Sequence, residues 1–190
     1  RTLAGGILFL ILTVICSEIS FFLNSRLKKP KLTMSLVDYL AKADTSDVNV
    51  AGFLDFDSGQ IFWRAFTLAQ KSGLTEPTTA FLLYCLLSSR DPQIGFVVQR
   101  SGLDFSTLLL GLRQEMSNLK QTPVKPAGNF EKVLPLAAKI AQASGKSRIS
   151  PGDLLVALAE VDNVFQNFLT ESDMRQGDLA SLTAWRERWR

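Results

Sequence analysis

Enzyme catalysis relies on a few side-chain types, and this sequence lacks the most versatile of them. None of its 190 residues is histidine, which excludes Ser/His/Asp and Cys/His catalysis, histidine-ligated zinc and the usual general base. The two cysteines, Cys16 and Cys85, are too few for a disulfide framework or a four-ligand metal site. Serine and lysine are frequent, but nothing in the pattern places such a pair in a cleft. We therefore expect no catalytic residue and no metal site in this segment.

Two short motifs imitate ligand-binding loops without completing them. Residues 145–147 (GKS) match the end of a nucleotide-binding P-loop, but Ile140 stands where that motif needs its first glycine. Residues 55–59 (DFDSG) resemble the start of an EF-hand calcium loop, but Phe66 occupies the position of the final glutamate ligand. The first motif is better explained as a helix end and the second as a solvated linker with capping aspartates. We expect no cofactor in this segment.

Aromatic side chains suggest a second kind of chemistry, which is binding. Phe81, Tyr84 and Phe96 could line an apolar groove for unfolded segments, although core packing is the alternative for each of them. The last six residues, 185–190 (WRERWR), place two tryptophans four positions apart with basic residues between them. Stacking on nucleic acid would use such a stripe, but packing against neighbouring protein explains it more simply. We predict protein partners and no nucleic acid.

The N-terminal residues predict a transmembrane helix. Residues 3–23 (LAGGILFLILTVICSEISFFL) carry one charge, at Glu18. At about 1.5 Å per residue they would form a helix about 31 Å long, which matches a hydrocarbon core of about 30 Å. A carboxylate at the bilayer centre costs about 2.5–3.5 kcal/mol. Glu18 lies near the end of the run, where it can take up a proton or reach the interface.

The residues that follow the apolar run predict its orientation. Arg26, Lys28, Lys29 and Lys31 form a basic cluster with no acidic residue among them, and such clusters usually stay on the cytoplasmic side. A cleaved signal peptide, with an apolar stretch of about 7–15 residues and a small-residue cleavage site, is one alternative. A buried core helix is the other. The length of the run favours an anchor, with the rest of the chain in the cytoplasm.

From residue 32 onward the apolar spacing is helical, and no stretch alternates for long enough to predict a sheet. Helices are expected at residues 57–72, 77–90, 93–100, 104–119, 130–144, 152–160, 164–170 and 179–189. Pro77 is expected to start the second of these helices, because proline suits a first turn. Asp104 or Ser106 is expected to cap the fourth, and Asp178 the last. Residues 122–129 (TPVKPAGN), with two prolines and a glycine, predict a linker.

The two halves of this helical region resemble each other at a constant offset of 72 residues. The pattern AxxxAQxSG occurs at residues 65–73 and again at 137–145. The same offset superposes a leucine triplet, at 82, 83 and 86, on leucines at 154, 155 and 158. Alanines four apart allow close helix approach, and the glycine permits a left-handed helix end. Chance similarity of amphipathic helices is the alternative, but the shared order and offset favour a duplication.

The predicted fold is therefore all-α, with two pseudo-repeats of about four short helices packed as one domain after a single transmembrane helix. The expected boundaries are residues 1–23 for the transmembrane helix and 24–49 for a basic, then acidic, juxtamembrane linker. The first repeat covers 50–121, the linker 122–129, and the second repeat 130–190, where a connector to a following domain begins.

One segment carries a family resemblance. Phe130–Asn163 (FEKVLPLAAKIAQASGKSRISPGDLLVALAEVDN) resembles the Clp repeat, which occurs twice in the N-terminal domain of the Clp family of AAA+ unfoldases and chaperones. Ile61–Leu87 is a looser copy, and the resemblance extends over about residues 50–182. With its preceding apolar run, the chain also resembles membrane-anchored Clp-type ATPase subunits of bacteria, truncated before the ATPase.

This resemblance implies a domain that recruits protein substrates or adaptor proteins to an ATP-dependent Clp protease, and that is not itself an enzyme. ATP, magnesium and ring assembly would belong to a missing ATPase module. The implied location is the bacterial inner membrane, with a single pass and the C-terminal domain in the cytoplasm. Some relatives bind phosphoarginine through paired glutamates, which Ala80 and Gly152 replace here, so that activity is not carried over.

Two alternatives remain open. One is a free-standing Clp-like membrane adaptor or scaffold without an ATPase. The other is an unrecognised hydrolase, which the absence of histidine disfavours.

Overall fold

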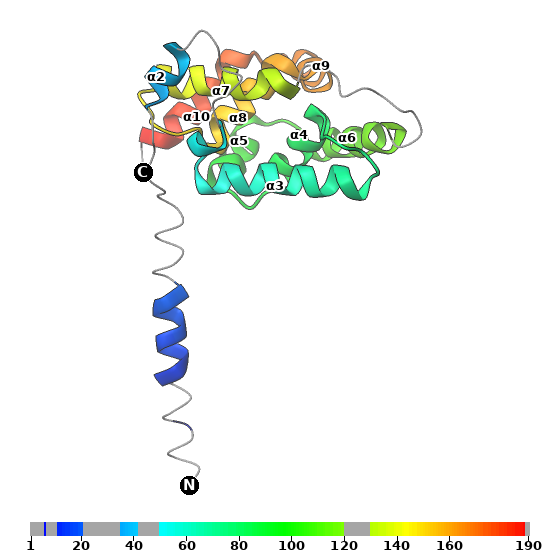
Figure 1. Ribbon diagram of the computed structural model, residues 1–190. Helices are drawn as coiled ribbons and strands as arrows, with labels where there is room; N and C mark the ends of the chain where they lie inside the picture. The colour runs from blue at the N-terminus through cyan, green and yellow to red at the C-terminus, as the bar shows by residue number, and fades with distance from the viewer. Residues whose placement is uncertain (1–5, 7–10, 21–34, 42–49, 120–129, 189–190) are drawn as a thin grey trace. The chain divides into compact units, whose positions relative to one another are not determined.

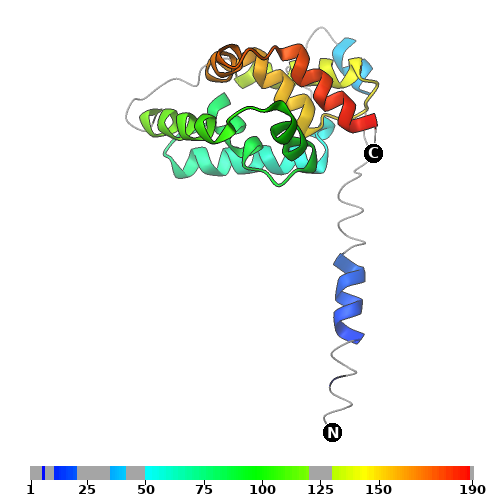
Figure 2. The ribbon, with the colours of Figure 1, turned by 180° about the vertical axis from the view of Figure 1, so that it is seen from behind.

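The computed structural model describes residue 6 and residues 11–20, 35–41, 50–119 and 130–188. The chain divides into two compact units, Arg1–Thr33 and Met34–Arg190. Within the described residues of the second unit the elements are helices and no strand occurs (Figure 1; Figure 2, from behind). The predicted all-α class is confirmed.

In the first unit, residues 11–20 are helical. Their large apolar side chains are about half exposed, between 48% and 59%: Ile11, Leu12, Val14, Ile15 and Ile19. Among the described residues, no helix has both the length and the apolar character needed to cross a bilayer. Much of the predicted span 3–23 lies outside those residues, as does the basic cluster Arg26, Lys28, Lys29 and Lys31. The membrane anchor therefore stays a prediction.

In the second unit, one order of four helices occurs twice. The first set is α3 (Phe56–Lys71), α4 (Thr79–Leu87), α5 (Pro92–Ser101) and α6 (Phe105–Leu119). The second set is α7 (Phe130–Ala143), α8 (Pro151–Val161), α9 (Asn163–Glu171) and α10 (Gln176–Arg188). From the starting residues, α8, α9 and α10 follow α4, α5 and α6 by 72, 71 and 71 positions. Both sets lie in one compact unit, while the exact boundaries of the repeats stay predictions.

The repeated glycines end α3 and α7 with the same turn. Gly73 and Gly145 have φ angles of 83° and 71°, a left-handed conformation that costs glycine little. After α3, the Gly73 amide donates to the Gln70 carbonyl and the next amide to Ala69. After α7, the corresponding bonds reach Gln142 and Ala141. This is the Schellman arrangement, so the shared sequence pattern specifies a shared helix ending.

Helices α4 and α8 form the centre of the unit. Both are apolar on nearly all sides, which is typical of a buried helix. In α8 every residue from Pro151 to Ala159 is buried, and in α4 six of the nine residues are buried. Helix α8 contacts α7, α9 and α10 of its own set and α3, α4 and α5 of the other. The two repeats therefore share one core around α8.

A short backbone contact joins the start of the first repeat to the α7–α8 connection. Leu54 and Ile149 form an isolated parallel bridge. The Ile149 amide donates to the Phe53 carbonyl at 2.8 Å, and the Asp55 amide donates to the Ile149 carbonyl at 3.0 Å. The Arg148 guanidinium also donates to the Leu54 carbonyl, at 3.3 Å. These bonds anchor the segment before α3 on the second repeat.

Several helix starts differ from their predicted positions, among them those of α3, α4 and α10. Asp55 caps α3 by accepting from the Ser58 amide at 2.7 Å, so α3 begins at Phe56. Pro77 is buried and lies two residues before α4, whose N-cap is Thr78; the expectation that Pro77 starts the helix was wrong. Asp178 lies in the first turn of α10, where its carboxylate accepts from the Arg175 amide at 2.9 Å.

Another difference concerns the segment predicted as a linker, residues 24–49. It contains α2 (Leu36–Ala41), which packs against α7. Leu36 and Tyr39, three positions apart and therefore on one helix face, are buried. The Tyr39 ring lies 5.1 Å from that of Phe53, in the short helix η1 (Val50–Phe53). Part of the expected linker is thus packed on the domain.

Candidate functional site

The structure does not gather the three predicted aromatic residues into one groove. Phe81 is fully buried, because α4 is enclosed by its neighbours, and it presents no surface to a partner. Tyr84 is half-buried beside α6. The Arg113 guanidinium lies 5.5 Å from the Tyr84 ring centre and donates to its hydroxyl at 3.1 and 3.2 Å. Tyr84 is therefore held in an internal contact of the first repeat.

Phe96 takes part in a contact between the repeats. Its ring lies 5.3 Å from that of Trp185, so it ties α5 to α10. The Arg100 guanidinium lies 5.9 Å from the centre of each ring, within range of a cation–π interaction. Trp185, which opens the C-terminal stripe, is thus engaged with protein side chains, as the packing interpretation expected.

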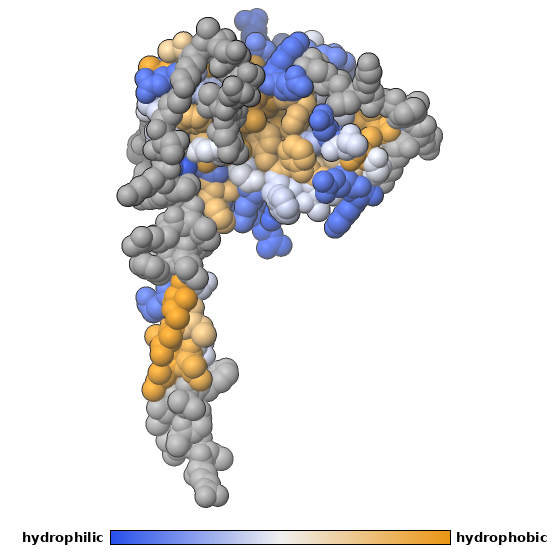
Figure 3. Space-filling view, in the orientation of Figure 1, coloured by the Kyte–Doolittle hydropathy of each residue, from blue (hydrophilic) through white to orange (hydrophobic). Residues whose placement is uncertain are grey.

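A different aromatic group is exposed on α3. The Trp63 side chain is 74% exposed and that of Phe66 37%. Phe130, at the start of α7, lies edge-on to Phe62 and Phe66, with ring centres 6.0 and 6.1 Å apart. We call Trp63, Phe66 and Phe130 the aromatic surface. In the view of Figure 3, hydrophobic residues gather between α3 and α7, with hydrophilic residues around them.

Helical spacing alone did not identify this surface. The sequence assigns Phe62 and Phe66 to the apolar face of α3, together with the buried Ile61 and Ala65. Which edge of that face stays uncovered depends on where α7 lies, and this contact joins distant parts of the chain. The signal in the sequence was Trp63. It directly follows Phe62, and two adjacent residues of a helix cannot both lie at the centre of its buried face.

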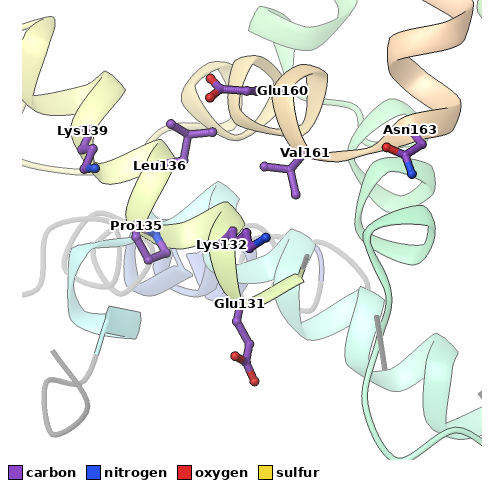
Figure 4. Close-up of a pocket in the computed structure, with 8 residues that line it drawn as sticks. All are labelled: Glu131, Lys132, Pro135, Leu136, Lys139, Glu160, Val161 and Asn163. Carbon is purple, nitrogen blue, oxygen red and sulfur yellow. The ribbon is translucent and has the colours of Figure 1, made fainter. Parts of the chain in front are cut away.

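A groove of about 690 Å³ lies between helices of the second repeat. We call it the α7–α9 groove; its lining residues are Glu131, Lys132, Pro135, Leu136, Lys139, Glu160, Val161 and Asn163. In Figure 4, Leu136 and Val161 point into the space between α7 and α8, whereas Glu131 points away from it. The groove therefore has an apolar floor with charged side chains at its rim.

Among the reactive groups of the described residues, Cys85 is buried and Lys146 is paired, whereas the Cys16 thiol is exposed. Burial raises the pKa of the Cys85 thiol to about 11, so it stays protonated at neutral pH and is a poor nucleophile. The Lys146 ammonium pairs with the buried Asp153 carboxylate at 2.7 Å, which also accepts from Ser150. No group of three or more His, Cys, Asp or Glu side chains in the described part could hold a metal ion.

The two positions at which some relatives carry glutamate are enclosed. Ala80, in the first turn of α4, is fully buried. Gly152, in the first turn of α8, is buried, and its amide donates to the Gln93 side-chain oxygen at 3.3 Å. The Gln93 side chain therefore lies where a side chain at position 152 would extend.

Comparisons with known proteins agree with this architecture. A family model described as the Clp repeat (R) N-terminal domain matches residues 57–172. The N-terminal domain of Hsp104 from Candida albicans is similar in structure, with a TM-score of 0.55 and 16% identity over 68% of this chain and 88% of that one. The N-terminal domain of the caseinolytic protease associated chaperone ClpD from Arabidopsis thaliana has a TM-score of 0.54 and 19% identity, over 75% and 99%. No curated protein matches the chain significantly.

Proposed function

Since the chain belongs to the Clp repeat N-terminal domain family, we propose that its helical unit recruits protein substrates or adaptor proteins to an ATP-driven Clp unfoldase. Domains of this family are non-catalytic and generally bind protein substrates or adaptors. The observation that carries the proposal here is the aromatic surface. Exposed aromatic side chains on a fixed framework can bury apolar residues of a partner with little further loss of side-chain freedom.

The recruiting role assigns different tasks to different parts of the protein. The helical unit would hold clients weakly and raise their concentration near the ring, which is the effective-concentration benefit of tethering. ATP and magnesium would bind a separate ATPase module, which would also form the ring. No nucleic acid is expected as a partner.

The aromatic surface can be tested by substitution in the full chain, reconstituted in lipid nanodiscs. The probe is a fluorescently labelled, carboxymethylated protein that cannot refold, and the measurement is its anisotropy. Trp63→Ser combined with Phe66→Ser should weaken binding at least tenfold, because it removes the apolar contact area. Leu110→Ser is the matched control, since Leu110 is 63% exposed on α6. Equal binding by wild type and the double variant would refute the assignment.

We further propose that residues 3–23 anchor the chain in the bacterial inner membrane, with Arg26, Lys28, Lys29 and Lys31 on the cytoplasmic side. The exposed apolar side chains of residues 11–20 support this. In a flotation assay, Leu12→Arg with Ile15→Arg should move the chain from the floating membrane fraction to the bottom of the gradient. Each charge buried in the bilayer costs about 2.5–3.5 kcal/mol. Val37→Arg is the control, since Val37 is 57% exposed on α2. Wild type that fails to float would refute the anchor.

The second candidate is a free-standing adaptor or scaffold with the same binding surface and no ATPase. Sequencing the gene beyond Arg190 distinguishes the two. A Walker A loop within about 100 residues supports the unfoldase subunit, and a stop codon supports the adaptor.

A further inference from the structure

Two lysines dominate the charge on one wall of the α7–α9 groove. Lys132 and Lys139 are seven positions apart on α7, which places them two turns apart on one helix face, about 10 Å from each other. Both side chains are exposed. Within the described part of the chain the one ion pair is Lys146–Asp153, so neither lysine has a carboxylate partner there.

The space between the two lysines is apolar. Leu136 lies between them on α7 and Val161 faces it from the end of α8; both are half-buried (Figure 4). Pro135 adds a further apolar surface. It also supplies no amide hydrogen to the Glu131 carbonyl.

The groove is also lined by two glutamates, neither of which forms an ion pair with Lys132 or Lys139 among the described residues. The Glu160 carboxylate accepts from the Gln176 side-chain amide at 3.0 Å. The Glu131 side chain points away from the groove in Figure 4. Asn163, at the start of α9, adds an amide that can donate or accept at the far wall.

We propose that the α7–α9 groove binds an extended segment of a partner protein in which one apolar residue lies between acidic residues. The carboxylates would pair with Lys132 and Lys139, and the apolar side chain would lie on Leu136 and Val161. An extended chain advances about 3.3 Å per residue, so acidic residues three or four positions apart match the lysine spacing. The proposal rests on the recruiting role, because it names the chemistry of one recruited partner.

Binding is measured by anisotropy with the full chain in nanodiscs and three labelled peptides. The first has a central leucine with two glutamates on each side; the second replaces leucine with serine, and the third replaces the glutamates with lysines. Wild type should bind the first at least tenfold more tightly than either of the others. Its affinity should fall as salt is raised from 50 to about 300 mM, as expected for partly exposed charges.

Charge reversal supplies the decisive comparison. Lys132→Glu with Lys139→Glu should weaken binding of the glutamate peptide at least tenfold and create binding of the lysine peptide. Lys71→Glu, at an exposed lysine on α3, is the control for a change of net charge and should alter affinity less than twofold. Both lysines lie on the surface, and an unchanged circular dichroism melt will verify folding.

Two results would overturn the proposal. Equal binding of the leucine and serine peptides would mean that the lysines attract any polyanion and that the floor is not used. Full affinity of the double charge-reversal variant would place the peptide elsewhere. Binding of the carboxymethylated protein to wild type, measured on the same preparation, reports on the aromatic surface separately. If wild type binds the carboxymethylated protein but not the glutamate peptide, the groove proposal fails and the recruiting role stands.

Discussion

At the scale of single residues, Glu115 on α6 lies where its ionised carboxylate is disfavoured. One of its carboxylate oxygens is buried without a hydrogen-bond partner among the described residues. Burial, and then repulsion from Asp162, raise the pKa of Glu115 above its ordinary value of 4.5. The folded state therefore binds this proton more tightly than the unfolded state. The resulting stabilisation is present below pH 4.5 and is lost as the pH rises through the raised pKa.

Glu115→Gln should therefore stabilise the fold at pH 7 and leave it unchanged below pH 4.5. The gain should be less than about 1 kcal/mol, because the side chain is only half-buried and solvent screens its charge. Urea unfolding at pH 4 and pH 7 measures the difference. Glu76→Gln, at an exposed glutamate, should show no effect at either pH. An equal gain at both pH values would mean that ionisation is not the cause.

Gly152 leaves space that the Gln93 side chain occupies. A Cβ atom at this position would lie 2.7 Å from Cδ of Gln93 and 3.0 Å from its Oε1. Gly152→Ala should therefore cost roughly 1–2 kcal/mol in the free energy of unfolding, because Gln93 must leave its place. In a Gln93→Ala background the same change should be neutral or stabilising, since alanine favours a helix over glycine. Equal costs in both backgrounds would contradict this explanation.

At the scale of secondary-structure elements, Pro135 inside α7 is the clearest departure from helix preference. Pro135→Ala should raise the free energy of unfolding by roughly 1–3 kcal/mol, because it restores the amide donor to the Glu131 carbonyl and removes a steric clash. Thermal unfolding measures the gain. Pro92→Ala is the control: Pro92 occupies the first turn of α5, where proline is well suited, so its loss should not stabilise.

The elements also show how far the sequence predicts this fold. Every described helix from α3 to α10 was expected from apolar spacing, because amphipathic periodicity and caps such as Asp104 are local signals. The helix α2 was missed, since six residues give too short a pattern. Pro77 was misassigned because its burial depends on the surrounding fold. The aromatic surface and the α7–α9 groove arise from contacts between helices, which periodicity does not specify.

At the scale of the whole molecule, the shared core predicts one cooperative unfolding transition for Met34–Arg190. Ile149 belongs to the second repeat, is fully buried, and bonds through its backbone to residues before α3. Ile149→Ala should cost about 2–4 kcal/mol and should reduce hydrogen-exchange protection equally in α4 and α8. Wild-type protection of α4 in this variant would show that the repeats unfold independently.

The bond from Arg148 to Leu54 joins residues 94 positions apart. At about 5–20 residues per second, a ribosome needs about 5–20 seconds to synthesise the stretch between them. Until α8 emerges, the side of α4 that packs on α8 has no partner helix to cover it. The newly synthesised first repeat therefore exposes part of its apolar core until the second repeat is made, and in that interval it is open to aggregation or chaperone binding.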